Sequence, residues 1–165
     1  WRSIDRSRRE QDSVNLAPGG CRSPHRRSRY SVVVAHAPDQ LSPEALTFLA
    51  ERHLATLSLI DAGGELHVTP VGFTWDNETQ TARVITFADA KKVRIVAARD
   101  ATPAALSQVD GGRWFTLHGA ATVTADPTIN ADAERRYAER YRPPGDRGAD
   151  RRTIEIVVNR IVGRC

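Results

Sequence analysis

Two adjacent lysines, Lys91 and Lys92, are the only lysines of the chain and follow an apolar run of β character. A short helix is predicted to begin at this point. An ammonium group beside the free N–H groups of a helix start is suited to binding phosphate, and Thr86 at the end of the preceding strand adds a hydroxyl donor. The residues therefore indicate a phosphate site, with a solvated helix start carrying two surface lysines as the alternative.

Three other side chains could act on a substrate. His67 lies in a predicted strand, and an imidazole near its reference pKa of about 6.5 can donate a proton. Arg113 could bind a carboxylate through two parallel hydrogen bonds, and Trp114 could stack on a flat ligand. The alternatives are a solvent-facing strand histidine, a surface arginine of a hairpin and a tryptophan that packs in the core.

Metal and nucleophile motifs are missing from the sequence. The five histidines show no i, i+4 pairing and have no cysteine pair nearby, so no metal site is expected. No Gly-x-Ser-x-Gly, Walker or Gly-x-Gly-x-x-Gly motif is present. Any enzymatic chemistry is therefore expected to come from an organic cofactor.

The length and composition match one domain with a hydrophobic core. The chain has 165 residues, of which 40% are hydrophobic and 27% charged. No apolar run approaches the roughly 20 residues that a membrane-spanning helix needs, so a membrane protein is not expected. Cys21 and Cys165 lie near opposite ends and provide no disulfide framework, which favours a cytoplasmic location.

The net charge of +4 arises entirely in residues 1–40, since residues 41–165 carry 16 basic and 16 acidic side chains. Nucleic-acid binding is therefore not expected of the domain. Residues 1–40 are rich in Arg, Ser, Pro and Gly and are predicted to be a disordered leader or the result of a mis-assigned start. A mis-assigned start would place the true one near Val32 to Val34, because the chain begins with Trp1 and contains no methionine. The predicted domain covers residues 41–165.

Capping and turn signals divide this domain into three helices and six strands. Ser42 precedes a proline and is an expected N-cap, Asp126-Pro127 is expected to open the last helix, and Asp110-Gly111-Gly112 is typical of a tight hairpin. On the last helix Tyr137 and Tyr141 are assigned to packing. Six antiparallel strands with few helices favour a barrel, a mainly β fold of the α+β type. The predicted helices cover 43–52, 91–99 and 127–141, and the predicted strands cover 53–60, 66–75, 81–87, 103–109, 113–124 and 153–162.

With these elements in place, residues 41–163 resemble the pyridoxamine 5′-phosphate oxidase-like split β-barrels. The resemblance is carried by the spacing from Thr86 to Lys92, the strand 105–109, the hairpin 110–114 and the strand 119–123. It implies a six-stranded antiparallel split β-barrel with short peripheral helices, which forms a homodimer. Several strings are most similar to the branch of this family that binds the deazaflavin coenzyme F420: Glu51-Arg52-His53-Leu54-Ala55, Val71-Gly72-Phe73-Thr74, Ala82-Arg83-Val84-Ile85-Thr86, Leu106-Ser107-Gln108-Val109-Asp110-Gly111 and Arg136-Tyr137-Ala138-Glu139-Arg140-Tyr141-Arg142.

The same resemblance implies a set of cofactor-binding residues. Lys92, Lys91 and Thr86 would hold the phosphate, and the second strand would run along the deazaflavin ring. Gln108 and Trp114 match positions near the ring or its tail across the dimer interface. The residues implied to line the ring are Thr69, Pro70, Val71, Gly72 and Ile85.

The function implied by the resemblance is hydride transfer from the reduced deazaflavin to a flat, conjugated substrate, in the first place biliverdin, which would give bilirubin. Arg113 would bind the substrate's propionates, and His67 or solvent would supply the proton. Two alternatives remain at this point. One is an FMN-binding oxidase on the same barrel, and the other is a non-catalytic carrier of a cofactor or tetrapyrrole.

Overall fold

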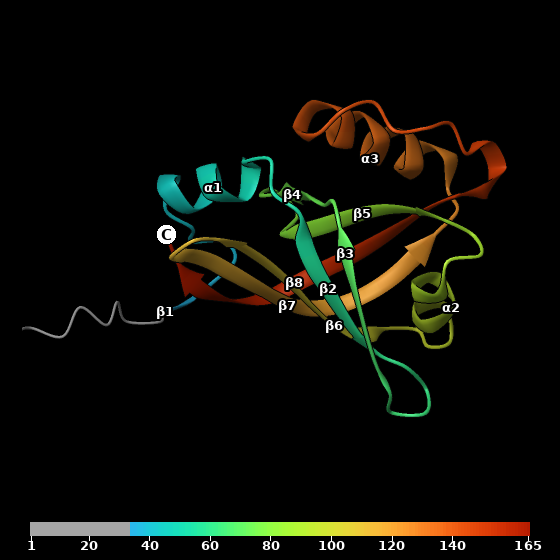
Figure 1. The fold of residues 1–165 in the computed structure, drawn as a ribbon, viewed down its shortest axis with the longest axis horizontal. Coiled ribbons are helices and arrows are strands. Elements are labelled where there is room, and N and C mark those ends of the chain that lie inside the picture. Colours follow the sequence, from blue (N-terminus) through green and yellow to red (C-terminus); the bar gives the residue numbers. More distant parts are fainter. Residues whose placement is uncertain (1–33) are drawn as a thin grey trace, which may run out of the picture. The chain divides into compact units, whose positions relative to one another are not determined.

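The computed structural model describes residues 34–165, which form an eight-stranded antiparallel sheet with three α-helices and one short 3₁₀-helix (Figure 1). The predicted fold class is confirmed. The strands are β1 (Val34–His36), β2 (Ala55–Ile60), β3 (Leu66–Val71), β4 (Thr74–Asp76), β5 (Thr81–Phe87), β6 (Thr102–Asp110), β7 (Arg113–Thr124) and β8 (Arg151–Arg164). The helices are α1 (Pro43–Ala50), α2 (Lys91–Ala97), α3 (Pro127–Arg140) and η1 (Gly148–Asp150).

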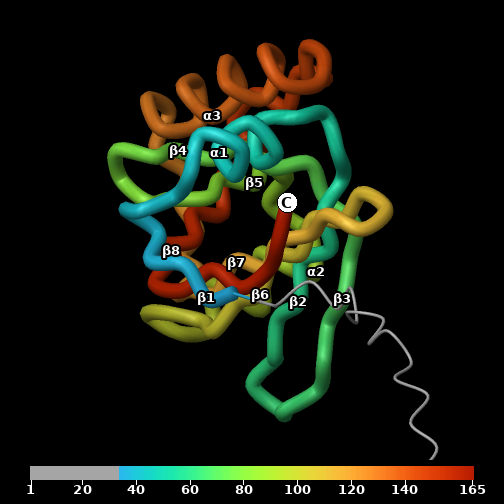
Figure 2. Tube along the Cα trace, turned by 90° about the vertical axis from the view of Figure 1, so that its left-hand side faces the viewer, coloured from blue at the N-terminus to red at the C-terminus, as the bar shows by residue number. Residues whose placement is uncertain are grey.

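The sheet curls round so that its two ends leave a split. The strand order is β3-β2-β6-β7-β8-β5-β4, and β1 is added on β8 (Figure 2). Within the described sheet β3 pairs only with β2. β4 pairs with β5 only at residues Thr81 to Arg83, so residues 84–87 of β5 form strand hydrogen bonds on one side alone, with β8. Both ends of the sheet therefore keep strand edges whose backbone N–H and C=O groups have no strand partner.

The core follows from the alternation of side chains along the strands. In β2 and β6 every second side chain is buried, and its neighbours are exposed or half-buried. β7 and β8 follow this alternation less regularly, with Thr153 and Ile154 of β8 both buried. From α1, Phe48 and Leu49 complete this core. The largest buried apolar side chains are Phe48, Phe73, Phe115, Leu49, Leu57, Leu59, Leu106, Leu117, Ile154, Ile156 and Ile161.

The predicted helix starts are confirmed. The Ser42 hydroxyl accepts a hydrogen bond from the Ala45 N–H at 3.2 Å. The Asp126 carboxylate accepts from the N–H groups of Thr128 and Ile129, at 2.8 and 3.1 Å. None of the helices in residues 34–165 is long and apolar enough to cross a membrane.

The structure differs from the prediction in two places. The run 66–75, expected as one strand, divides into β3 and β4, because side chains of α3 and its C-cap take both backbone groups of Phe73. The Tyr141 hydroxyl accepts from the Phe73 N–H at 3.1 Å, and Arg140 donates to its carbonyl. In addition, residues 34–36 of the predicted leader form β1, which pairs with β8. The prediction for residues 1–33 lies outside the described residues.

A buried ion pair closes the turn between β4 and β5. Asp76 accepts from Arg83 at 2.9 Å and from the Glu78 N–H at 3.0 Å, and Arg136 lies 3.2 Å away. Burial raises the pKa of Asp76, but the hydrogen bonds from Arg83 and Glu78 outweigh it and lower the pKa from 3.8 to about 2. The carboxylate form is therefore favoured by folding.

This depressed pKa predicts a pH-dependent contribution to stability. The contribution is complete above the unfolded-state pKa of about 3.9 and is lost as the pH falls through about 2. Asp76→Asn should lower the free energy of unfolding by about 1 to 2 kcal/mol at pH 7 and by much less near pH 2. Urea unfolding at both pH values measures this, with the exposed Asp89→Asn as control. An equal loss at the two pH values would contradict the linkage.

Candidate functional site

A groove of about 520 Å³ lies at the split, between the last residues of β3 and the last residues of β5. The N-terminal turn of α2, the C-terminal half of α3 and the loop after α3 complete its walls. Six residues predicted for the cofactor line it together: Pro70, Val71, Gly72, Ile85, Thr86 and Lys92. The other lining residues are Phe87, Tyr137, Arg142, Pro143, Pro144, Gly145, Arg147 and Arg151.

Among residues 34–165, four cationic side chains and no acidic one line the groove. Arg151 is buried and already engaged, through an ion pair with Glu134 and hydrogen bonds to backbone carbonyls. By contrast, no ion pair within residues 34–165 involves Lys92, Arg142 or Arg147. Their charges are therefore available to an anionic ligand.

The two lysines occupy different surroundings. Lys92 is half-buried and lines the groove, and burial lowers the pKa of its ammonium group. Lys91 is exposed and lies at a separate shallow pocket beside Asp61 and Arg94. The structure thus brings Lys92 and Thr86 together with the β3 residues, and leaves Lys91 outside.

Tyr137 forms a wall of the groove that the sequence did not predict. Its ring stacks on Tyr141, with 4.7 Å between the ring centroids, and lies against Gly72. A Cβ atom at Gly72 would come within 2.7 Å of Tyr137 Cε2, so glycine is required for this approach. The helical spacing of the tyrosines indicated one shared face, but the partner of that face, Gly72, lies in the link between β3 and β4, 65 residues earlier in the chain.

The loop after α3 is the second part of the groove that the sequence did not identify. The Arg142-Pro143-Pro144-Gly145 segment predicts the end of a helix, and α3 ends just before it. In the folded chain it also lines the groove, and Arg147 beyond it places its guanidinium 5.0 Å from the centroid of the Phe87 ring. No spacing motif in the sequence marks this second role.

Gln108 lies in the core and does not line the groove. Its amide donates to the Phe48 carbonyl at 2.6 Å, and its side-chain oxygen accepts from Arg140 at 2.7 Å. Phe48 is in the last turn of α1, whose carbonyls have no partner within the helix. Gln108 therefore caps the end of α1, and its predicted cofactor contact stays a prediction.

Arg113 is held by carboxylates of the protein itself. It donates to both oxygens of Glu51 at 2.9 Å and also to Asp110, and these hydrogen bonds raise the pKa of the guanidinium. It also lies over the Phe48 ring, 4.7 Å from the centroid. His53, Glu51 and Asp110 bring potential metal-ligand atoms within 4.8 Å of one another. Because Arg113 already binds both carboxylates, this cluster is a charge network.

The remaining predicted residues lie near the groove or on another face. His67 and Thr69 are on the same face of β3 as Val71, which lines the groove, but they do not line it themselves. Burial and the charges of the two lysines lower the pKa of His67, which favours the neutral form of its imidazole. Trp114 is half-exposed on β7, opposite Val109 of β6.

Comparisons with known proteins identify the family of the chain. The family model described as pyridoxamine 5′-phosphate oxidase matches residues 41–165. The F420H(2)-dependent biliverdin reductase of Mycobacterium tuberculosis is 45% identical over 133 residues, which cover 80% of this chain and 94% of that protein.

Two solved structures share the fold at low sequence identity. A putative pyridoxamine 5′-phosphate oxidase from Listeria innocua has a TM-score of 0.59 at 17% identity, covering 73% of this chain and 94% of the other. A structure named F420 reductase has a TM-score of 0.54 at 23% identity, covering 70% and 93%. The chain therefore belongs to the pyridoxamine 5′-phosphate oxidase family.

Proposed function

We propose that the protein is a coenzyme F420-dependent oxidoreductase that holds the deazaflavin in the groove between β3 and β5. The observation that carries this proposal is the groove itself, which has cations, no acidic side chain and a half-buried Lys92 without a carboxylate partner. The 45% identical relative, named an F420H(2)-dependent reductase, supports the same cofactor.

The groove residues fit both parts of such a cofactor. Backbone groups at the free edges of β3 and β5 can form hydrogen bonds with the edge of a flat heterocycle. Gly72 lets the Tyr137 ring approach the link between β3 and β4, and Tyr137 thereby limits the space in the groove. Lys92 and the Thr86 hydroxyl are the residues that would hold the phosphate.

The bound reduced deazaflavin supplies a hydride, and the protein supplies position and charge. We propose that the substrate is a conjugated tetrapyrrole, biliverdin, which is reduced to bilirubin, as the name of the relative suggests. Arg142 and Arg147 are then the partners for its carboxylates, since Arg113 is occupied by Glu51 and Asp110. The lowered pKa of His67 disfavours its protonated form, so solvent is the proposed source of the proton.

The protein is further proposed to act in the cytoplasm as a homodimer. The outer face of β3, β2 and β6 carries apolar side chains exposed to solvent, with Leu66, Val68 and Val109 each at least half exposed. Trp114 is paired with Val109 on this face. A second copy packed there would cover these side chains and bring Trp114 toward the partner's groove. Sedimentation equilibrium tests whether the protein forms a dimer.

A fluorescence titration of the purified protein with F420 and, separately, with FMN tests the cofactor assignment. We expect F420 to bind with micromolar or tighter affinity and FMN to bind more weakly. Binding followed by loss of biliverdin absorbance with reduced F420 supports the reductase. Preference for FMN would instead favour an oxidase on the same barrel, and tight binding without turnover of biliverdin would favour a carrier.

A further inference from the structure

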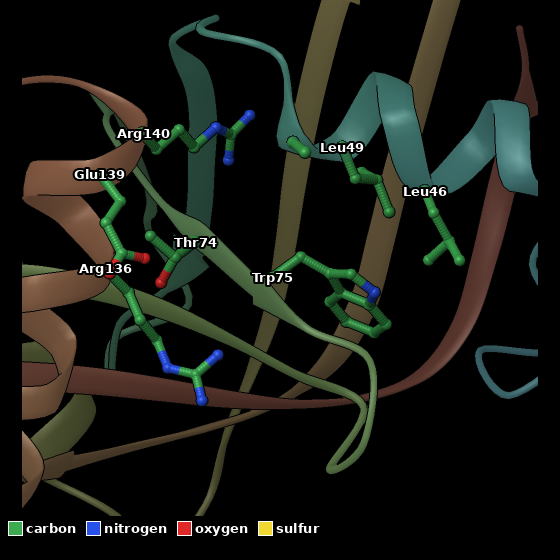
Figure 3. A pocket seen from close by; sticks show the side chains of 8 residues that line it. Leu46, Leu49, Thr74, Trp75, Arg136, Glu139 and Arg140 are labelled. Atoms are coloured by element: carbon green, nitrogen blue, oxygen red, sulfur yellow. The ribbon is translucent and has the colours of Figure 1, made fainter.

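A second cavity, of about 350 Å³, lies between α1, β4 and α3 (Figure 3). Its lining shares no residue with the groove. In Figure 3 side chains of α3 reach in from one side and leucines of α1 from the other, with the Trp75 indole between them. The lining residues are Leu46, Leu49, Ala50, Thr74, Trp75, Arg136, Glu139 and Arg140.

One half of this cavity is apolar. Leu46 and Leu49 come from α1, and Trp75 comes from β4 with its ring half-exposed. Together they offer an apolar slot with one aromatic wall, suited to a flat or branched hydrocarbon group. The volume lies at the small end of the range for ligand sites, so the ligand would be small.

The other half carries positive charge that the protein balances incompletely. Arg140 donates to the backbone carbonyls of Glu51 and Phe73 and to the side-chain oxygen of Gln108, all of which are uncharged. No ion pair within the described residues includes Arg140. The carbonyl dipoles at the end of α1 offset part of its charge, but no carboxylate does.

The two remaining charged groups of the cavity are paired. Arg136 bonds to Asp132 at 2.8 Å and lies 3.2 Å from Asp76. Glu139, which would repel an anion, is bonded to the exposed Arg135 at 2.6 Å on the helix surface. The α3 side of the cavity therefore offers the guanidinium groups of Arg136 and Arg140 to a carboxylate, and the acidic lining residue Glu139 is bonded to Arg135.

We propose that this cavity binds a small amphipathic carboxylate, whose hydrocarbon part lies against Leu46, Leu49 and Trp75 and whose carboxylate faces the arginines of α3. This site is independent of the cofactor groove and of the reaction proposed there. It would take an aromatic or branched aliphatic acid.

The test uses 4-(trifluoromethyl)benzoate as a probe, with fluorine NMR as the readout and the uncharged 4-(trifluoromethyl)benzamide as its matched control. We expect the benzoate to bind with millimolar or tighter affinity and the amide to bind at least about tenfold more weakly. Arg136→Gln should weaken the benzoate at least about fivefold. Arg94→Gln, an exposed arginine of α2 that lies outside the cavity, should change its affinity less than about twofold.

Two further variants distinguish binding in this cavity from binding in the groove. Leu46→Trp at a half-buried position should fill the cavity and abolish binding of the probe even if Arg136→Gln folds poorly. Lys92→Ala removes a cation of the groove and should leave the benzoate affinity unchanged, whatever it does to the cofactor. Equal affinity for acid and amide, equal effects of the Arg94 and Arg136 variants, loss of binding in Lys92→Ala, or no binding at all at about 10 mM probe would each overturn the proposal.

Discussion

Lys92→Ala should weaken the binding of F420 by about 10- to 100-fold without changing the fold, because it removes the groove's half-buried ammonium group from the phosphate. A charge-assisted hydrogen bond contributes about 1.5 to 3 kcal/mol, which corresponds to this range of affinity. Fluorescence titration measures the affinity, and circular dichroism shows whether the fold is retained.

The neighbouring lysine provides a matched control for this experiment. Lys91→Ala removes the same charge one residue away, but Lys91 is exposed and lies outside the groove, so the affinity should change less than about twofold. A deazaflavin without the phosphate should bind wild type and Lys92→Ala alike. If both lysine variants weaken F420 equally, the effect is general attraction and the assignment of the phosphate to Lys92 is wrong.

Arg140→Met should lower the free energy of unfolding by about 4 kcal/mol, because three acceptors in the interior would lose their donor at once. These acceptors belong to the end of α1, the link between β3 and β4, and β6. The guanidinium also lies 4.2 Å from the centroid of the Phe73 ring, so packing is lost with the hydrogen bonds. Urea denaturation monitored by fluorescence measures the change.

Two comparisons show whether the loss comes from these contacts. Arg135→Met removes an arginine of the same helix that bonds only to exposed acidic side chains, and it should leave the unfolding midpoint nearly unchanged. Gln108→Leu combined with Arg140→Met should cost less than the sum of the single variants, since both remove the same hydrogen bond. Additive losses, or a loss in Arg135→Met as large as in Arg140→Met, would contradict the role assigned to Arg140.

The elements that the sequence predicted correctly depend on signals close together in the chain. Ser42 and Asp126 cap helices whose N–H groups lie two or three residues away. The Asp110-Gly111-Gly112 hairpin joins β6 and β7 at the expected residues, and Gly111 has the positive φ of 56° that this turn requires. The groove residues on β3 and β5 and Lys92 were identified by family resemblance, and the structure brings them together.

The features that the sequence did not reveal depend on contacts between distant residues. The break between β3 and β4 is made by Tyr141, 68 residues after Phe73. Gln108 points into the core, where its amide donates to the carbonyl of Phe48, 60 residues earlier. Arg113 is held by the carboxylate of Glu51, 62 residues earlier. A polar side chain on a strand is compatible with both a ligand contact and an internal hydrogen bond. Only the folded chain shows which groups already have partners.

The free edges of β3 and β5 bear on how such a protein diverges over evolutionary time. Peptide N–H and C=O groups are the same in every residue except proline, so a ring recognised through them survives replacement of most side chains along the edge. Only a few positions then need a particular residue, such as Gly72, which admits the Tyr137 ring, and Lys92, the cation proposed to hold the phosphate. The other residues that line the groove can be substituted, and such substitutions can admit new substrates without changing how a cofactor is bound. This is one route by which a single fold acquires many reactions.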